Sequence, residues 1–242
     1  MTQSKTFLVG FDRFIALPWA EFALEMAVHS IEDKPEQVKK LKEYLSVFMK
    51  GEDATRKTAN VLTRLWLDTY PSLAYQREQA LRLYQETAPS AHLVLHWGMS
   101  LAVFPLFRDV ALQIGKLFQL QGSFSRQEIH TRLLEKYSNI STLPRSIDRI
   151  IQTMADWKTI VKQSGGTFTS QSVAIESPKL QQWLIALVLQ ATPGHRVLLN
   201  DIYRLPEIFP FTLTNGEQFQ IPVGTRVERD GNNMEYLVVK QK

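Results

Sequence analysis

The chain has 242 residues, of which 44% are hydrophobic and 21% charged, and its formal net charge is +4. This composition is ordinary for a soluble globular protein built from one large domain or two to three small ones. The absence of cysteine excludes disulfides, thiolate metal sites and cysteine nucleophiles, and it fits a reducing cytoplasm.

The hydrophobic segments do not indicate a membrane protein. The N-terminus lacks a basic region followed by an apolar run and a cleavage site, so no signal peptide is expected. The most apolar window, residues 93–107, contains His96 and Pro105 and is shorter than the ~20 residues that a membrane span requires. We therefore expect a cytoplasmic protein with no membrane partner and interpret this window as a buried helix.

The net charge is confined to one segment. Residues 107–169 contain nine Lys/Arg and five Asp/Glu, whereas residues 1–106 carry twelve of each and residues 170–242 seven of each. This concentration of positive charge indicates a binding activity in the central segment.

The chain begins with an apolar segment followed by two helices. Residues 7–17 predict a strand or an extended arm packed on the body. Pro18 is placed to open a helix that ends near Ile31, and Pro35 opens a second helix that Gly51 ends. The inner face expected for the second helix is Val38, Leu41, Leu45, Val47 and Phe48.

A basic helix is predicted after Gly51. Its apolar stripe is Val61, Leu62, Leu65 and Trp66. Another face carries Arg56, Asn60 and Arg64 at i, i+4 and i+8, with Lys57 beside them. This face indicates either a second helix-turn-helix that contacts DNA or a solvated face of a helical domain, and we favour the second interpretation slightly.

Two further helices are expected over residues 73–86 and 91–104. The second is apolar nearly all round, which predicts that it runs through the centre of the protein. Pro105 either interrupts it or starts the next helix, residues 106–119, which Gly122 follows. The inner positions expected for that helix are Phe107, Val110, Ile114, Leu117 and Phe118.

The next two helices form the centre of the basic segment. Ser125 and Glu128 have the spacing of a capping box, which opens a helix. The residues expected to be buried from that helix are Ile129, Leu133, Leu134 and Tyr137. After a linker of turn-forming residues, Pro144 lies near the first turn of the following helix, with Ser141 or Thr142 as the candidate cap.

The helix over residues 142–157 has a clear amphipathic pattern. Its predicted inner face is Ile147, Ile150, Ile151, Met154 and Trp157, and its predicted outer face is Arg145, Ser146, Asp148, Arg149, Gln152 and Thr153. Arginine can pair with guanine edges and glutamine with adenine, while Ser and Thr suit phosphate oxygens. Asp148 would be repelled by phosphate unless it pairs with Arg145 or Arg149 or reads a cytosine amine.

A hairpin is predicted directly after this helix. Two β-prone runs flank Ser164, Gly165 and Gly166, where glycine supplies the positive φ of a tight turn. Lys158 and Lys162 would place charge along it. Helix, helix, turn, helix and hairpin is the order of a winged helix-turn-helix, whose commonest use is to hold duplex DNA. The residues predicted to contact DNA are Arg145, Ser146, Arg149, Gln152, Thr153, Lys158, Lys162 and Arg126, with Arg56, Lys57, Asn60 and Arg64 as a second group.

The C-terminal part combines a helix with β structure. Pro178 opens a helix to about residue 189, with Leu180, Trp183, Leu184, Leu187 and Val188 inward. A short helix near residues 198–204, a β segment from Phe209, a turn at Asn215-Gly216 and a hairpin over residues 225–240 follow. The balanced charge of residues 170–242 argues against a separate DNA surface in this part of the chain. This part is either a small α+β domain or a second, degenerate winged helix, used for dimerisation or partner docking.

These elements together predict a mainly α protein with small β hairpins. The expected parts are an N-terminal helical domain (residues 1–90), a central winged helix-turn-helix with its lead-in helices (residues 91–176) and a C-terminal α+β region (residues 177–242).

The sequence contains no catalytic or cofactor motif. Phosphate-binding loops, dinucleotide turns and nucleophile elbows are absent. His92 and His96 have the i, i+4 spacing that can chelate zinc, but their neighbours are apolar and no Glu lies between them, so core or interface histidines are the favoured interpretation. We predict no catalytic residue, no metal and no cofactor.

Two segments resemble a known family. Ala-Thr-Arg-Lys-Thr-Ala-Asn-Val-Leu-Thr-Arg-Leu at 54–65 and Ser-Thr-Leu-Pro-Arg-Ser-Ile-Asp-Arg-Ile-Ile at 141–151 resemble the BrxA proteins of the bacterial BREX phage-defence systems. That family combines an N-terminal helical region bearing a basic helix with a winged helix, and it binds duplex DNA. The resemblance covers about residues 15–185. It implies duplex DNA and other subunits of a defence complex as partners.

The leading hypothesis is a non-enzymatic double-stranded DNA-binding protein, acting as a regulator or as an accessory subunit of a bacterial DNA-processing or phage-defence complex. The alternative is a protein–protein interaction scaffold whose winged helix docks a partner or mediates dimerisation, because fold alone does not establish function. An enzyme that acts on DNA or a nucleotide has no motif to support it.

Overall fold

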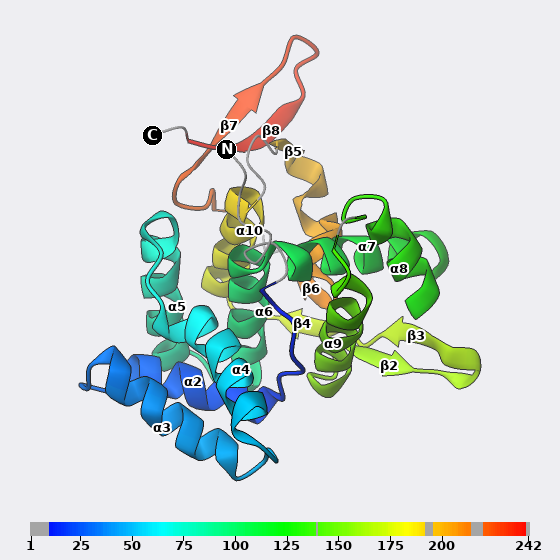
Figure 1. Cartoon of the computed structure of the whole chain (residues 1–242). Helices are drawn as coiled ribbons and strands as arrows, with labels where there is room; N and C mark the ends of the chain where they lie inside the picture. Colours follow the sequence, from blue (N-terminus) through cyan, green and yellow to red (C-terminus); the bar gives the residue numbers. More distant parts are fainter. Residues whose placement is uncertain (1–9, 139, 192–195, 214–219, 241–242) are drawn as a thin grey trace.

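The computed structural model describes residues 10–138, 140–191, 196–213 and 220–240 (Figure 1). Helices make up most of these residues, and the strands form small sheets. The predicted class, mainly α with small β hairpins, is confirmed. The predicted turn at Asn215-Gly216 and the start of the N-terminal arm lie outside the described residues.

The N-terminal helices lie together on one side of the molecule (Figure 1). An arm of irregular backbone, which buries Phe11 and Ile15 completely, leads into them. The helices are α2 (Leu17–His29), α3 (Lys34–Ser46), α4 (Glu52–Leu62), the π-helical turn η1 (Thr63–Leu67), the 3-10 turn η2 (Pro71–Leu73) and α5 (Ala74–Glu86). Asp33 caps α3 by accepting a hydrogen bond from the backbone N–H of Glu36 at 3.1 Å.

Two helices joined at Pro105 form the centre. They are α6 (His92–Val103), preceded by the 3-10 turn η3 (Pro89–Ala91), and α7 (Pro105–Gln121). Most side chains of α6 are buried, as its all-round apolar sequence predicts. Pro105 starts α7, and Gly122 ends it with a left-handed φ of 75°. No single helix in the described ranges is long and apolar enough to cross a membrane; α6 with η3 meets that test only together with α7, across a bend of 114°.

The basic segment folds as helices around a small antiparallel sheet. Its elements after α7 are β1 (Phe124–Ser125), α8 (Arg126–Leu134), α9 (Leu143–Asp156), β2 (Ile160–Lys162), the 3-10 turn η4 (Ser164–Gly166) and β3 (Thr167–Ser170). The strand order is β1-β3-β2, and Phe124 lies opposite Phe168. This succession of helices, strands and turns follows the order that the sequence predicts for residues 107–169, and the β2–β3 hairpin, which we call the wing, projects from the body (Figure 1).

The C-terminal part returns to the centre before it forms a peripheral sheet. Its elements are β4 (Val173–Ile175), α10 (Pro178–Ala191), β5 (Arg196–Leu198), the 3-10 turns η5 (Leu199–Arg204) and η6 (Pro206–Ile208), β6 (Phe211–Leu213), β7 (Thr225–Arg229) and β8 (Glu235–Val239). Strands β4 and β6 pair in parallel, and β5-β8-β7 is antiparallel. The predicted β7–β8 hairpin and the short helix before it are confirmed.

One hydrophobic core joins the three predicted parts of the chain. Phe11 of the arm contacts the rings of Phe104 and Phe107 with centroids 5.2 Å away in both pairs. Helix α10 packs against both α5 and α6, and η6 packs against α7. Among the described residues, the boundaries at 90 and 176 therefore do not separate independent cores.

Two predictions about inner faces were wrong at helix ends. Helix α3 ends at Ser46, so Val47 and Phe48 lie beyond it and are 79% and 55% exposed. Leu134 is the last residue of α8 and is also exposed. In both cases the helical spacing of apolar residues continues to the end of the helix or beyond it, where the side chains no longer meet the core.

Candidate nucleic-acid interface

The capping box fixes the start of α8. The Ser125 hydroxyl accepts a hydrogen bond from Glu128 N–H at 3.3 Å, and the Glu128 carboxylate accepts one from Ser125 N–H at 2.7 Å. Ser125 is also the second residue of β1. The cap therefore links the β1-β3-β2 sheet to α8, the helix that precedes α9.

Helix α9 is held by its apolar face. All the residues predicted for that face are buried: Ile147, Ile150, Ile151, Met154 and Trp157. Thr142 is the N-cap residue, but its side chain makes no capping hydrogen bond. The first turn of α9 therefore has no side-chain cap, which suits an N-terminus that approaches a phosphate.

The exposed face of α9 is narrower than predicted. Arg145 and Gln152 are exposed and Arg149 is half-buried. The Arg149 guanidinium donates to the Gln152 side-chain oxygen at 2.7 Å. These three side chains form what we call the α9 polar face: Arg145, Arg149 and Gln152.

Ser146 and Thr153 do not belong to this face, so their predicted outward position was wrong. They are 1% and 0% exposed. The Ser146 hydroxyl donates back to the Thr142 carbonyl at 3.1 Å. The Thr153 hydroxyl accepts the backbone N–H of Ile15 at 2.9 Å, because the N-terminal arm crosses this end of α9.

Asp148 finds partners on α8 instead of on its own helix. Its carboxylate lies 2.9 Å from Arg126 Nη1 and 3.2 Å from His130 Nε2. The carboxylate is thus neutralised by α8, and not by Arg145 or Arg149, the two partners considered from the sequence. Arg126 also lies over the Phe168 ring, 5.4 Å from its centroid. His130 was missed in the sequence, although it lies one helical turn after Arg126 and so shares its face.

The wing, the β2–β3 hairpin, turns at the predicted residues. Gln163 N–H donates to the Thr167 carbonyl at 2.8 Å, and Gly165 and Gly166 supply φ values of 78° and 81°. Lys162 lies exposed on β2. Lys158 is exposed too, but it lies between α9 and β2 with a φ of 56°, so it is at the base of the wing and not along it.

Several acidic residues of this module are held by neighbouring groups. Asp109 holds Lys136 at 2.6 Å and also accepts the Tyr137 hydroxyl. The Asp156 carboxylate accepts the backbone N–H of Leu17 at 2.9 Å. Within the described part of the chain, Arg145, Lys158 and Lys162 form no ion pair. Unpaired positive charge therefore lies on the α9 polar face and at the wing, and also at Arg108 and Lys116 of α7 and Arg132 of α8.

The second predicted group, on α4, is weaker as a DNA surface. Arg56 and Lys57 both pair with Asp53, at 2.6 Å each, and Asn60 is exposed. Arg64 points inward: it donates to the Gly10 carbonyl at 3.4 Å and lies 5.1 Å from the centroid of the Phe104 ring. Its predicted outward position was wrong because the helix changes to π geometry at Thr63.

His92 and His96 share a carboxylate in the core. His92 Nδ1 and His96 Nε2 lie 3.4 and 3.2 Å from the Glu21 oxygens. Trp66 Nε1–H, which can only donate, bonds His96 Nδ1 at 3.0 Å, so the neutral His96 ring carries its proton on Nε2, toward Glu21. In the described ranges, no group of three or more His, Cys, Asp or Glu side chains is arranged to hold a metal ion.

Burial and hydrogen bonding together set the pKa values of this cluster. Burial lowers the pKa of His96 below its usual value, although Glu21 opposes this shift. For Glu21, burial raises the pKa, but the hydrogen bond and charge of His96, together with His92, outweigh it and the net pKa is lowered. The cluster therefore favours an ionised Glu21 beside a neutral His96.

Comparison of the chain with protein-family models, with curated proteins and with solved structures gave no match. The functional argument consequently depends on the geometry of the module itself.

Proposed function

We propose that the protein binds double-stranded DNA through its winged helix-turn-helix. Helix α9 enters the major groove with its polar face toward base edges, and Lys158 and Lys162 contact the phosphate backbone beside the groove. Arginine and glutamine are side chains that read guanine and adenine in that groove. No cofactor, metal or catalytic group takes part in this proposal.

The observation that carries the proposal is the separation of charge within the module. Asp109, Asp148 and Asp156 are bound by neighbouring side chains or backbone, whereas Arg145 is exposed and unpaired among the described residues. A surface from which the acids are withdrawn presents a positive potential to a polyanion. Phosphate contacts of this kind supply most of the affinity and release counterions.

A charge-reversal experiment tests the proposal. In the Arg145→Glu/Arg149→Glu variant we expect duplex affinity to fall by at least about 30-fold, because two base or phosphate contacts are replaced by repulsion. The measurement is a mobility-shift titration repeated across a salt series. The salt slope should also become shallower, by roughly one for each phosphate that the variant no longer neutralises.

The matched control carries the same change of charge on α4. Arg56→Glu/Lys57→Glu reverses two charges that already pair with Asp53, so its affinity should stay within about threefold of the wild type. If the α9 variant binds duplex DNA as tightly as the wild type with the same salt slope, α9 is not the DNA-reading helix.

Protein docking is the second candidate, and exposed apolar side chains on the same module favour it. Leu120, Leu134 and Val161 are 75%, 42% and 42% exposed, and such residues suit a protein partner better than DNA. A wild-type chain that binds no duplex at low salt, but forms a stoichiometric complex with the product of a neighbouring gene, would replace the DNA proposal with this one.

The biological setting we propose is a bacterial regulator or an accessory subunit of a DNA-processing or phage-defence complex in the cytoplasm. The cysteine-free composition and the resemblance of residues 54–65 and 141–151 to BrxA proteins support it. Homodimerisation through the C-terminal region belongs to the same proposal, supported by the exposed Ile221, Val223 and Met234. Sedimentation of the purified chain measures it directly.

A further inference from the structure

Strand β7 (Thr225–Arg229) forms one edge of the β5-β8-β7 sheet, which lies at the periphery of the molecule (Figure 1). It pairs antiparallel with β8, with Val227 opposite Leu237. Leu237 is fully buried and Val227 packs against the core, so one face of the sheet is held on the body. An edge strand presents backbone N–H and C=O groups to which another strand can be added.

The backbone groups on the outer side of β7 follow from its pairing with β8. Lys240 N–H donates to the Gly224 carbonyl at 2.8 Å, and these two residues continue the register of the strands. Hydrogen-bonded pairs alternate along an antiparallel ladder, so Arg226 and Glu228 bond β8, whereas the N–H and C=O of Val227 point to the outer side. In the ranges that the structure describes, no other strand pairs with that side. Val227 is therefore the centre of an open edge.

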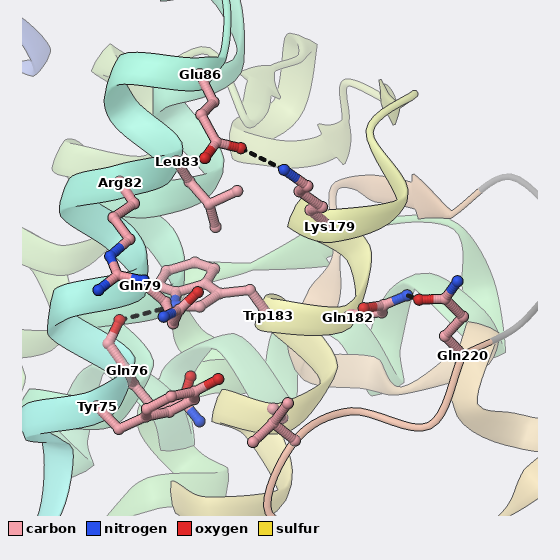
Figure 2. A pocket seen from close by; sticks show the side chains of 12 residues that line it. Tyr75, Gln76, Gln79, Arg82, Leu83, Glu86, Lys179, Gln182, Trp183 and Gln220 are labelled. Atoms are coloured by element: carbon pink, nitrogen blue, oxygen red, sulfur yellow. Dashed lines mark hydrogen bonds and ion pairs between the residues drawn. The ribbon is translucent and has the colours of Figure 1, made fainter.

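The segment that precedes β7 is fixed to the body as well. Figure 2 shows Gln220 of this segment beside α10, at one wall of a pocket of about 410 Å³. There the Gln182 side chain of α10 donates to the Gln220 side-chain oxygen at 3.2 Å. Helix α10 also packs against β8. Contacts before β7 and on its neighbouring strand thus hold the open edge in one position.

The charges of β7 are complementary to those of a second β7. Arg226 and Glu228 lie on the same face of the strand, because they are two residues apart, and within one chain Arg226 Nε donates to the Glu228 carboxylate at 2.9 Å. When two such strands lie antiparallel with Val227 opposite Val227, each Arg226 is directly opposite Glu228 of the other chain. A parallel arrangement in register places like charges side by side instead. Opposite charges across a strand pair stabilise it and like charges destabilise it.

Exposed apolar side chains lie near both ends of the open edge. Ile221 and Val223, which precede β7, are 52% and 65% exposed, and Met234, in the connection to β8, is 43% exposed. Antiparallel pairing places the start of one β7 beside the end of the other. The end that carries Met234 then meets the end that carries Ile221 and Val223, and burial of these side chains adds to the stability of the pair.

We propose that β7 pairs antiparallel with β7 of a second copy of the chain, centred on Val227, which joins the two three-stranded sheets into one continuous sheet. At the centre, each Val227 N–H donates to the Val227 carbonyl of the other chain. The inference rests on the homodimerisation proposed above and assigns it a strand and a register. The same two-fold axis relates the two proposed DNA-binding surfaces, which suits a duplex with two half-sites.

Charge reversal tests the pairing, and sedimentation of the purified full chain measures it. Arg226→Glu puts two carboxylates opposite each other at two symmetric positions, so the dissociation constant of the dimer should rise about tenfold. Arg226→Glu/Glu228→Arg restores opposite charges and should restore the wild-type constant. Lys39→Glu, which reverses an exposed charge that pairs with Glu36 on α3, is the control and should leave it unchanged. Thermal melting confirms that each variant is folded.

Cysteine cross-linking tests the register, because the chain has no cysteine of its own. Arg226 and Glu228 of the other chain form a non-hydrogen-bonded pair, with Cα atoms about 4.5 Å apart. Two copies of the same position lie on a diagonal of about 7–8 Å, beyond the usual span of a disulfide. An oxidised mixture of Arg226→Cys and Glu228→Cys chains should therefore form covalent dimers on a non-reducing gel, and either variant alone should form few.

Each other outcome overturns the inference. A wild-type chain that sediments as a monomer at about 100 µM removes the homodimerisation as well. A dimer that Arg226→Glu does not weaken uses another surface, and so does one that the double reversal fails to restore. Equal cross-linking in the mixture and in the single variants contradicts the register. Neither measurement contains DNA, so failure here is separate from failure of the DNA proposal.

Discussion

Thr153 joins the C-terminal half of α9 to the N-terminal arm. Its hydroxyl is the acceptor for the backbone N–H of Ile15, and Trp157 Nε1–H donates to the Ile15 carbonyl at 3.0 Å. The backbone N–H and carbonyl of Ile15 are thus both hydrogen-bonded, one by Thr153 of α9 and the other by Trp157, the residue directly after it. A polar residue that faces DNA and one that satisfies a buried backbone group look alike in sequence, but they respond differently to substitution.

We predict that Thr153→Val lowers the free energy of unfolding by about 1–3 kcal/mol, because the Ile15 N–H becomes a buried donor without a partner. Duplex affinity of the folded protein should be unchanged. Urea denaturation and a mobility shift measure the two quantities. Thr131→Val, on the exposed face of α8, should change stability by less than about 0.5 kcal/mol. Weaker DNA binding at unchanged stability would return Thr153 to the DNA-facing group.

The Glu21–His96 cluster makes stability depend on pH. Because the folded pKa of His96 is lowered from 6.5, the unfolded chain takes up a proton first as the pH falls, and unfolding becomes easier. Glu21, also lowered from 4.5, contributes stability that is lost only at lower pH, as the pH falls through its folded value. Between pH 7.5 and 5.5 the effect therefore comes from His96.

We predict that the loss of stability between pH 7.5 and 5.5 is smaller by about 1 kcal/mol in His96→Gln than in the wild type. The Gln oxygen can still accept the Trp66 N–H, so the variant removes the titration and keeps an acceptor. Urea denaturation at the two pH values measures this difference. His29→Gln, an exposed histidine, should keep the wild-type dependence. Identical pH dependence in all three proteins would contradict the assignment to His96.

At the scale of elements, periodicity predicted the helices and the wing well. The buried stripe of α9, the capping box of α8 and the β2–β3 hairpin depend on contacts between residues close in sequence, which a local pattern encodes. Helix ends were less predictable: the π turn at Thr63–Leu67 turns Arg64 inward. A single inserted residue per turn leaves no clear mark in the spacing of side chains.

Contacts between distant elements account for what the sequence did not predict. The spacing of Ser146 and Thr153 in the sequence predicts the polar side of α9, but both are buried, and Ile15 of the arm, which bonds Thr153, is 138 residues away. Helices α5 and α10 are joined by the hydrogen bond from Trp183 Nε1–H to the Gln76 backbone carbonyl, between residues 107 apart. Such contacts exist only after the core has formed, because the two residues are distant in the sequence.

At the scale of the whole molecule, the C-terminal part is bound to the central helices α6 and α7. Trp97 Nε1–H donates to the Glu207 carbonyl at 3.0 Å, and the Gln119 side chain donates to the Arg204 carbonyl at 2.8 Å. Gly115 of α7 lies directly beneath this segment, where an added Cβ would lie 1.9 Å from the Pro206 carbonyl oxygen. The close approach of α7 and η6 requires glycine at this position.

We predict that Gly115→Ala lowers the free energy of unfolding by about 2 kcal/mol, because the methyl group forces η6 away from α7. This loss should exceed the gain of up to about 1 kcal/mol from the better helix propensity of alanine. Urea denaturation measures the stability. Gly231→Ala, where an added Cβ meets nothing within 4 Å, is the matched control. If Gly115→Ala is as stable as the wild type, the C-terminal segment is not held against α7 in solution, and residues 177–242 behave as the separate unit that the sequence indicates.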